Sequence, residues 1–263
     1  MRRYFLLVLT PLLLLRAADP PTAIIVSSAN PAVGVTTDSL ASVYGDHIAS
    51  VTASAPSLPW PTSLGDIPSV GIADSAGQSF TAQLMFVSPS QMNLWIPAGV
   101  ATGPATLSFP VTGLPPGVGA AALRNVPFRV AKVAPGLFIL DHGGVAAATG
   151  TRVTIPTGIQ NPVAVFRCDP GSNCVPVPIN VGVDAPVYLS LYGTGIRGVG
   201  TGDVMVKIAD TPVKATYAGP QGTIPGLDQV NVPLPLSLRG SGVVNVVVIV
   251  GGVKSNPVKI AIQ

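Results

Sequence analysis

Two cysteines are the side chains of this sequence whose type and spacing most directly predict chemistry. Cys168 and Cys174 enclose the turn-forming residues Asp-Pro-Gly-Ser-Asn, and the N-terminus has the features of an export signal. Two cysteines in an exported chain predict a disulfide, which would pin a surface hairpin with about 2 kcal/mol of stabilisation. Zinc is the alternative, but it commonly takes four Cys and His ligands. Neither His47 nor His142 lies at ligand spacing from the cysteines, so we expect no metal site.

A glycine-rich segment matches a nucleotide-binding loop by its letters alone. Gly193-Thr-Gly195-Ile-Arg-Gly198 fits G-x-G-x-x-G. In a dinucleotide site a helix follows the glycines, and its N-terminus holds the pyrophosphate. Here Val-Gly-Thr-Gly and a predicted strand, Asp203–Ile208, follow instead. The segment is therefore predicted to be a β-turn, and no cofactor is expected.

The other candidates for catalysis are single residues in turn-like surroundings. Nucleophilic catalysis needs Ser or Cys with a positioned base, but the sequence has no G-x-S-x-G, and His47 and His142 each follow an Asp near glycine. All eleven acidic residues are Asp, and most lie beside Gly, Pro, Ser or Thr, as turn residues do. A carboxylate pair for glycoside hydrolysis and a calcium site in the loops remain open alternatives. We predict that the protein is not an enzyme.

The elements that must position these residues are short β-strands. The 29 Gly and 28 Pro residues interrupt apolar, Val-rich runs, and no stretch of twelve residues has a helical apolar period. Such a sequence is typical of an all-β fold with tight turns and almost no helix, and evenly spaced short strands favour sandwiches. The predicted strands are Ser39–Tyr44, Val70–Ile72, Gln83–Val87, Met92–Ile96, Ala105–Phe109, Val126–Val130, Val187–Tyr192, Asp203–Ile208, Val213–Tyr217, Gln229–Leu234, Val243–Val250 and Val258–Ile262.

These strands fall into two sets with matching anchors, which indicates an internal repeat; chance similarity among Val-rich strands is the alternative. We predict two tandem β-sandwich domains, 19–132 and 133–263, the second with a cysteine-bearing hairpin near its start. The repeated anchors are Tyr44, Gly45, Gln91 and Asn93 in the first set and Tyr192, Gly193, Gln229 and Asn231 in the second.

The Gln-x-Asn strands place two amides on one face, because successive side chains of a strand point to opposite faces. Gln91 and Asn93 share a face in the first set, as Gln229 and Asn231 do in the second. One interpretation is a polar ladder that recognises a ligand. The other is that the amides satisfy the backbone of a neighbouring loop, and we favour this framework role because the pair is repeated.

Trp60 is the side chain that we single out as a candidate ligand contact. Pro59 and Pro61 flank it and could hold it at the surface, where Trp is favoured at binding hot spots. The alternative is that Trp60 caps one end of the first sandwich.

The first eighteen residues are predicted to be a secretory signal peptide. Arg2 and Arg3 precede an apolar run, Tyr4–Leu15, which is followed by small residues. The run is too short to span a bilayer, so we expect no transmembrane segment after cleavage. Three of the 14 basic residues leave with the signal, and 14 − 3 = 11 remain against 11 acidic ones. The mature chain is then neutral, which excludes the basic footprint of a nucleic-acid-binding protein.

Several motifs occur in order along nearly all of the predicted mature chain. They are Leu58-Pro-Trp-Pro-Thr-Ser-Leu-Gly65, Val87-Ser-Pro-Ser-Gln-Met-Asn-Leu-Trp-Ile-Pro97, Ala134-Pro-Gly-Leu-Phe138, Leu191-Tyr-Gly-Thr-Gly-Ile-Arg197, Tyr217-Ala-Gly219, Gly226-Leu-Asp-Gln-Val-Asn-Val-Pro233 and Ser255-Asn-Pro-Val258. Together these motifs resemble the Solibacter-type uncharacterised C-terminal domain family of secreted and surface proteins of acidobacteria. In that family the unit usually ends a longer protein, whereas here it is expected to be the whole mature chain. The resemblance implies an extracellular, immunoglobulin-like or related sandwich and no catalytic residues.

These observations together predict a secreted, periplasmic or cell-surface protein without enzymatic activity. We expect it to bind a macromolecule, protein or polysaccharide, or to act as a structural spacer. A carbohydrate-binding accessory module is the alternative, and a hydrolase with a site between the domains is the least favoured reading.

Overall fold

The computed structural model describes residues 23–112, 123–171, 173–183 and 185–263. Their structure is all-β with several sheets, as predicted, and its two helical turns are the 3-10 helices η1 (Thr201–Asp203) and η2 (Leu236–Leu238). The predicted signal peptide, 1–18, lies outside the described residues. Over the residues that are described, no helix has the length and apolarity needed to cross a membrane.

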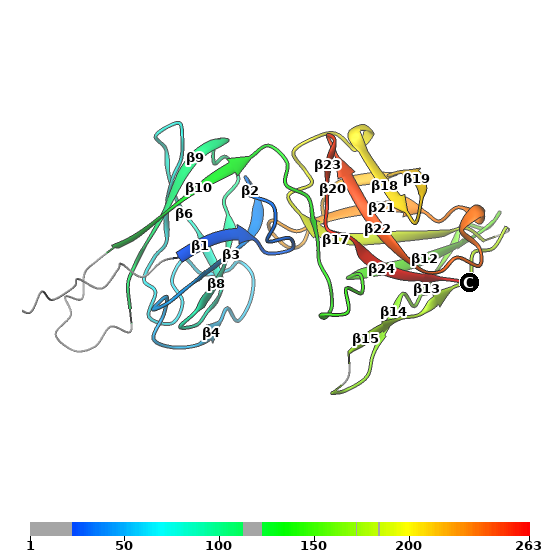
Figure 1. Ribbon diagram of the computed structural model, residues 1–263, viewed down its shortest axis with the longest axis horizontal. Coiled ribbons are helices and arrows are strands. Elements are labelled where there is room, and N and C mark those ends of the chain that lie inside the picture. The colour runs from blue at the N-terminus through cyan, green and yellow to red at the C-terminus, as the bar shows by residue number, and fades with distance from the viewer. Residues whose placement is uncertain (1–22, 113–122, 172, 184) are drawn as a thin grey trace, which may run out of the picture.

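The N-terminal half, residues 23–131, contains two five-stranded sheets (Figure 1). One has the order β1-β3-β8-β7-β4 and the other β2-β10-β9-β5-β6. Neighbouring strands are antiparallel except β2 and β10, which are parallel. The bounds are β1 Ala23–Ser27, β2 Val35–Thr36, β3 Ser39–Gly45, β4 Ala53–Ser54, β5 Gly71–Ala73, β6 Ser79–Thr81, β7 Gln83–Val87, β8 Gln91–Ile96, β9 Gly103–Pro110 and β10 Leu123–Ala131.

The C-terminal half, residues 133–263, also has two large sheets. One has the order β13-β12-β17-β21-β20, with β11 beside β17, and the other has the order β16-β24-β22-β18-β19, with β23 beside β22. The bounds are β11 Gly136–Leu137, β12 Ala148–Thr154, β13 Ile159–Val163, β16 Pro178–Ile179, β17 Val187–Thr194, β18 Val204–Ile208, β19 Thr211–Lys214, β20 Tyr217–Pro220, β21 Asp228–Pro233, β22 Gly242–Val250, β23 Val253–Lys254 and β24 Val258–Ile262.

A separate hairpin carries the two cysteines and extends away from these sheets (Figure 1). It consists of β14 (Phe166–Cys168) and β15 (Cys174–Pro176), in which Cys168 lies opposite Cys174. The two sulfurs are bonded, so the predicted disulfide is confirmed.

The two halves share a strand order, apart from β4 in the first half and β11, β13 and β23 in the second. The series β1-β3-β8-β7 of the first half corresponds to β12-β17-β21-β20 of the second, and β2-β10-β9-β5-β6 corresponds to β16-β24-β22-β18-β19. The equivalent pairs β2–β10 and β16–β24 are both parallel. The anchors of the predicted repeat also have equal registers, because Tyr44 lies opposite Gln91 and Tyr192 lies opposite Gln229.

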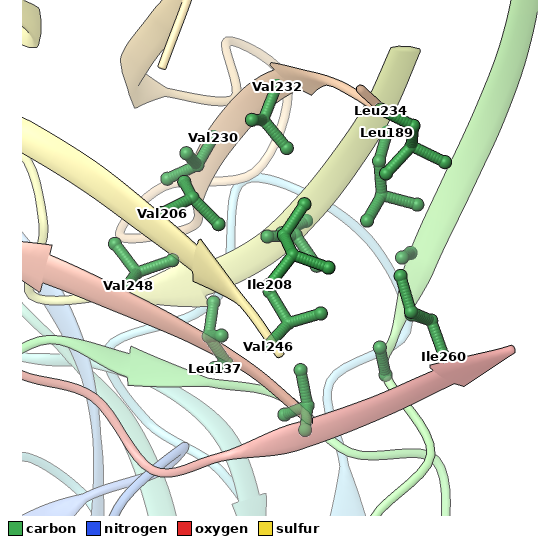
Figure 2. Packing of buried hydrophobic residues seen from close by; sticks show 14 of the residues in the cluster. Leu137, Leu189, Val206, Ile208, Val230, Val232, Leu234, Val246, Val248 and Ile260 are labelled. Atoms are coloured by element: carbon green, nitrogen blue, oxygen red, sulfur yellow. The ribbon is translucent and has the colours of Figure 1, made fainter. Parts of the chain in front are cut away.

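Each half encloses its own hydrophobic cluster. The first contains buried residues between Val35 and Val130, and the second contains residues between Leu137 and Ile262. Strict alternation of buried and half-buried residues along β8 and β21 turns one face of each strand to the core. Figure 2 shows the second cluster between its two sheets, with labelled side chains including Leu189, Val230 and Val232 from one sheet and Val206, Ile208, Val246, Val248 and Ile260 from the other.

The predicted strand Val213–Tyr217 is wrong. The chain forms β19 and β20 there, which belong to different sheets. The turn between them lies at Ala215 and Thr216, where the chain crosses from one sheet to the other. The predictions also omitted β1, β2, β4, β6 and β23, together with β11 to β16 except for the cysteine hairpin. Most of these strands are short, polar or interrupted by Gly and Pro.

Asp74 ties the turn between β5 and β6 to a neighbouring loop. Its carboxylate accepts hydrogen bonds of 2.9 Å from the backbone N–H groups of Ala76, Gln78 and Ala101. The bond from Ala101 is the main cause that lowers the pKa of Asp74, with smaller contributions from the other two. Because these donors favour the charged form, the native state holds the Asp74 proton less tightly than the unfolded chain does.

The stability that Asp74 contributes should therefore depend on pH. A lowered native pKa means that the contribution is present above the ordinary Asp value of 3.8 and is lost as the pH falls through the lowered pKa. We expect Asp74→Asn to unfold at a lower temperature than the wild type at pH 7, and the gap to close at acidic pH. Thermal unfolding of both proteins between pH 7 and pH 2 measures this, and a constant gap would contradict the assignment.

Candidate functional site

Three charged side chains are joined by ion pairs where the two halves meet. Arg197 follows β17, and its side chain is 13% exposed. Its Nε donates to Asp228 Oδ1 over 2.6 Å, and one Nη donates to the carbonyl of Leu227 over 2.6 Å. The other Nη donates to Asp38. We call Asp38, Arg197 and Asp228 the junction cluster.

Asp228 is the fully buried member of the junction cluster. It begins β21, and its side chain has no exposed area. Besides Arg197 Nε, it accepts backbone N–H bonds from Ile196 at 2.7 Å and from Arg197 at 3.4 Å. Burial raises the pKa of Asp228, and the charge of Arg197 and these hydrogen bonds act against that rise. The carboxylate thus depends on Arg197 to remain charged in a dry site.

Asp38 connects this cluster to the N-terminal half. It lies between β2 and β3 with a φ of 49°, a left-handed conformation that Asp tolerates better than most residues. One carboxylate oxygen accepts a 2.8 Å bond from the indole N–H of Trp95, and the other accepts the bond from Arg197. Asp38 therefore joins a residue of β8 to a residue of the other half.

Thr194 makes a second polar connection between the halves. Its hydroxyl accepts a 2.9 Å bond from the backbone N–H of Leu40 and donates a 2.8 Å bond to the carbonyl of Gly226. Gly226 itself is packed so closely that a Cβ there would lie 2.9 Å from Trp95. The loop before β21 thus covers the ends of β3 and β8.

The segment predicted as a β-turn is only partly one, because Gly193 and Thr194 end the strand β17 and the chain turns after Gly195. Its glycines have a packing role. A Cβ on Gly193, Gly195 or Gly198 would lie 2.0–2.3 Å from a backbone oxygen of the segment 132–136. Two of the backbone N–H groups that follow Gly195 bind the Asp228 carboxylate. The G-x-G-x-x-G letters thus describe a loop that holds an internal carboxylate and lies against the connection between the halves.

A shallow hollow lies beside the junction cluster. Its volume is about 280 Å³. The groups that line it include Asp38, Trp95 and Arg197, together with residues of the loop Pro220–Pro225. The carboxylate and the guanidinium bind each other, so these groups connect a sheet of one half to a sheet of the other.

A second hollow, of about 460 Å³, lies on the outer face of the sheet that contains β17. Here the predicted amide pair makes a side-chain bond, because Gln229 Nε2 donates to Asn231 Oδ1 over 2.7 Å. We call this surface the polar face. Its lining residues are Thr151, Val153, Gln160, Tyr188, Ser190, Thr216 and Asn231.

The equivalent amides of the N-terminal half form the same bond. Gln91 Nε2 donates to Asn93 Oδ1 over 2.8 Å. Asn93 also accepts a 2.9 Å bond from Ser42, whose hydroxyl is 2.9 Å from that of Ser28. Among the described residues, the side chains of both amide pairs bond to side chains and not to a loop backbone. The amides are therefore bonded within their own sheets, and both the ladder and the framework role stay predictions.

The remaining predicted residues lie apart from both hollows. Trp60 is half-buried in the loop between β4 and β5, and Tyr44 is 40% exposed on β3. Tyr192 is half-buried on β17, and its hydroxyl is 3.2 Å from that of Thr149. His47 and His142 are exposed in separate turns. In the described part of the chain, no three His, Cys or Asp side chains are grouped as a metal site would require.

The sequence prediction did not single out the junction cluster or Tyr188. Only 10% of the residues are charged, so a lone Arg197 after an apolar strand and a lone Asp228 before a Gln-x-Asn strand were usable signals. Asp38 gave no such signal, because its partner is 159 residues away.

Comparisons of the chain with protein-family models, curated proteins and solved structures find no match.

Proposed function

We propose that this protein is an exported, non-enzymatic module that binds a macromolecule and whose two halves act as one rigid body. The junction cluster carries the proposal. Its buried carboxylate and guanidinium could do chemistry elsewhere, but here they bond to each other, to backbone groups and across the two halves. Such a connection fits a protein that presents a surface at a fixed orientation, including a structural spacer.

The proposed architecture is two tandem immunoglobulin-like β-sandwich domains, 19–132 and 133–263. In the N-terminal half, the orders β1-β3-β8-β7 and β10-β9-β5 correspond to the A-B-E-D and G-F-C sheets of that fold. In the C-terminal half, β12-β17-β21-β20 and β24-β22-β18 do the same. The repeated order supports an origin by duplication.

The proposed location is the cell exterior or the periplasm. A disulfide persists in oxidising compartments, and the Cys168–Cys174 bond supports such a location. The basic and apolar start of the sequence supports export. Membership of the Solibacter-type family remains a prediction from the motifs.

Binding and turnover measurements test the proposed function. The exported chain is incubated with cell-envelope fractions, and bound protein is measured against concentration. The same chain is assayed for hydrolysis of polysaccharides, esters and peptides. Saturable retention without turnover is the expected result. Turnover would instead favour a hydrolase, and the absence of saturable retention would contradict a binding function.

A further inference from the structure

The polar face has the lining of a site for a neutral ligand that is rich in hydroxyl groups. Its lining combines three hydroxyl-bearing residue types, Thr, Ser and Tyr, with the amides of Gln160 and Asn231. None of these residues carries a charge at neutral pH. Small-molecule sites typically measure about 300–1,000 Å³ and combine apolar or aromatic surface with a few placed polar groups, and the hollow of about 460 Å³ lies in that range.

Most of these polar groups have hydrogen-bonding capacity to spare. The Asn231 amide oxygen accepts a bond from Gln229, which leaves its Nδ2 donor directed at no described partner. The Thr216 hydroxyl donates to the backbone carbonyl of Asn231. Among the described residues, no hydrogen bond involves the side chains of Thr151, Gln160, Tyr188 or Ser190, so a ligand can supply their partners.

The same positions of the N-terminal half are closed, which sets the polar face apart. By the repeat, Tyr188 corresponds to Leu40, and Ser190 corresponds to Ser42. Leu40 is buried, and a Cβ on Gly226 would lie 3.1 Å from its side chain. Ser42 is buried and bonded to Asn93. The duplicated surface is thus covered in one half, whereas in the other half it is hollow and hydroxylated.

We propose that the polar face binds a segment of a neutral polysaccharide, with Tyr188 as the main contact. This inference rests on the proposed binding function and names its ligand and its site. The Tyr188 ring supplies an amphipathic surface for a sugar ring. The surrounding amides and hydroxyls of Ser190, Asn231 and Thr151 exchange hydrogen bonds with sugar hydroxyls. The absence of charge in the lining favours neutral over acidic polysaccharides.

Affinity electrophoresis of the full exported chain tests the proposal. The protein migrates through gels that contain laminarin, mannan, dextran or soluble cellulose derivatives without charge, and through gels that contain alginate or polygalacturonate. We expect retardation by at least one neutral polymer and none by the acidic ones. Tyr188→Ala should weaken binding about tenfold or more, as the loss of a Tyr hot spot does. Thr151→Val, which keeps the side-chain shape, should weaken binding by a smaller factor.

Two variants of the N-terminal half serve as controls. Tyr44→Ala removes an exposed Tyr from the closed half, and Trp60→Ala removes the aromatic residue that the sequence suggested as a contact; neither should change retention. Circular dichroism verifies that each variant is folded. Binding that survives Tyr188→Ala in folded protein, binding lost with Trp60→Ala, or retardation by acidic polymers alone would each overturn the proposal. Saturable binding to envelope fractions without affinity for any neutral polymer would overturn this inference and leave the proposed function standing.

Discussion

Replacement of Arg197 by Gln is expected to destabilise the protein by about 3–5 kcal/mol, the usual cost of leaving a buried charge without its partner. Asp228 has no exposed area, and the Arg197 guanidinium is the charged group that bonds to it. Chemical denaturation at pH 7 measures the loss. The exposed pair Lys207–Asp210 provides the control, because Asp210→Asn should leave the stability nearly unchanged.

The pH dependence and a second substitution identify the cause of that loss. Without Arg197, the pKa of Asp228 rises further, and a raised native pKa means that stability falls as the pH rises through it. The deficit of Arg197→Gln should therefore be smaller at pH 4 than at pH 7. Asp228→Asn in the same chain removes the buried charge and should recover part of the loss. A deficit that does not depend on pH and is not reduced by Asp228→Asn would contradict this account.

The connection between the halves can be separated from the stability of the C-terminal half. Asp38→Asn removes one charge from the junction cluster and leaves the bonds between Arg197 and Asp228 in place. Asn also tolerates the left-handed backbone at this position. This variant should weaken the contact between the two halves more than it lowers the stability of either half. Small-angle scattering and denaturation of the same sample compare the two effects.

Gly195→Ala is expected to cost about 2–5 kcal/mol, because backbone strain and overpacking add. The residue has a φ of 75°, and an added Cβ would lie 2.2 Å from the carbonyl oxygen of Ala134. The left-handed backbone costs about 1–2 kcal/mol for an L-residue, and overpacking typically costs about 1–3 kcal/mol. The backbone of residue 195 fixes the position of the added Cβ, and the oxygen that it meets is a backbone atom of Ala134. Rotation of a side chain therefore cannot relieve the clash.

Three other glycines separate the two causes. Gly198→Ala adds only the clash, because its Cβ would lie 2.0 Å from the Lys132 oxygen and its φ is not positive. Gly158→Ala adds only the strain, since its φ is 71° and no atom lies within 4 Å of the added Cβ. Gly200→Ala adds neither, and it should be neutral or stabilise by up to about 1 kcal/mol. Equal melting temperatures for Gly198→Ala and Gly200→Ala would show that the close approach to the connecting segment is not needed.

Local patterns in the sequence were sufficient for the fold class and for most strands. Gln83–Val87 and Val258–Ile262 are observed with their predicted bounds, because a short apolar run bounded by turn-forming residues is a property of neighbouring positions. The register of the repeat could also be anticipated, since Tyr44 and Gln91 match Tyr192 and Gln229 in order. The disulfide followed from the chemistry of two cysteines around a short turn.

The tertiary structure decided which polar groups meet. Asp38 and Arg197 are 159 residues apart in the chain, and only the packing of the two halves brings them together. The glycines at 193, 195 and 198 look like a phosphate loop in the sequence, and their function as contacts for the segment 132–136 depends on chain that comes earlier. The two amide pairs are alike in sequence, but the surface beside them differs. The fold covers Leu40 in the first half and leaves the equivalent Tyr188 at a hollow in the second half. The sequence by itself determined which face of β8 and β21 is buried, because burial of apolar side chains follows a local period there. It did not determine that β3 is buried on both faces, because that depends on contacts with distant strands.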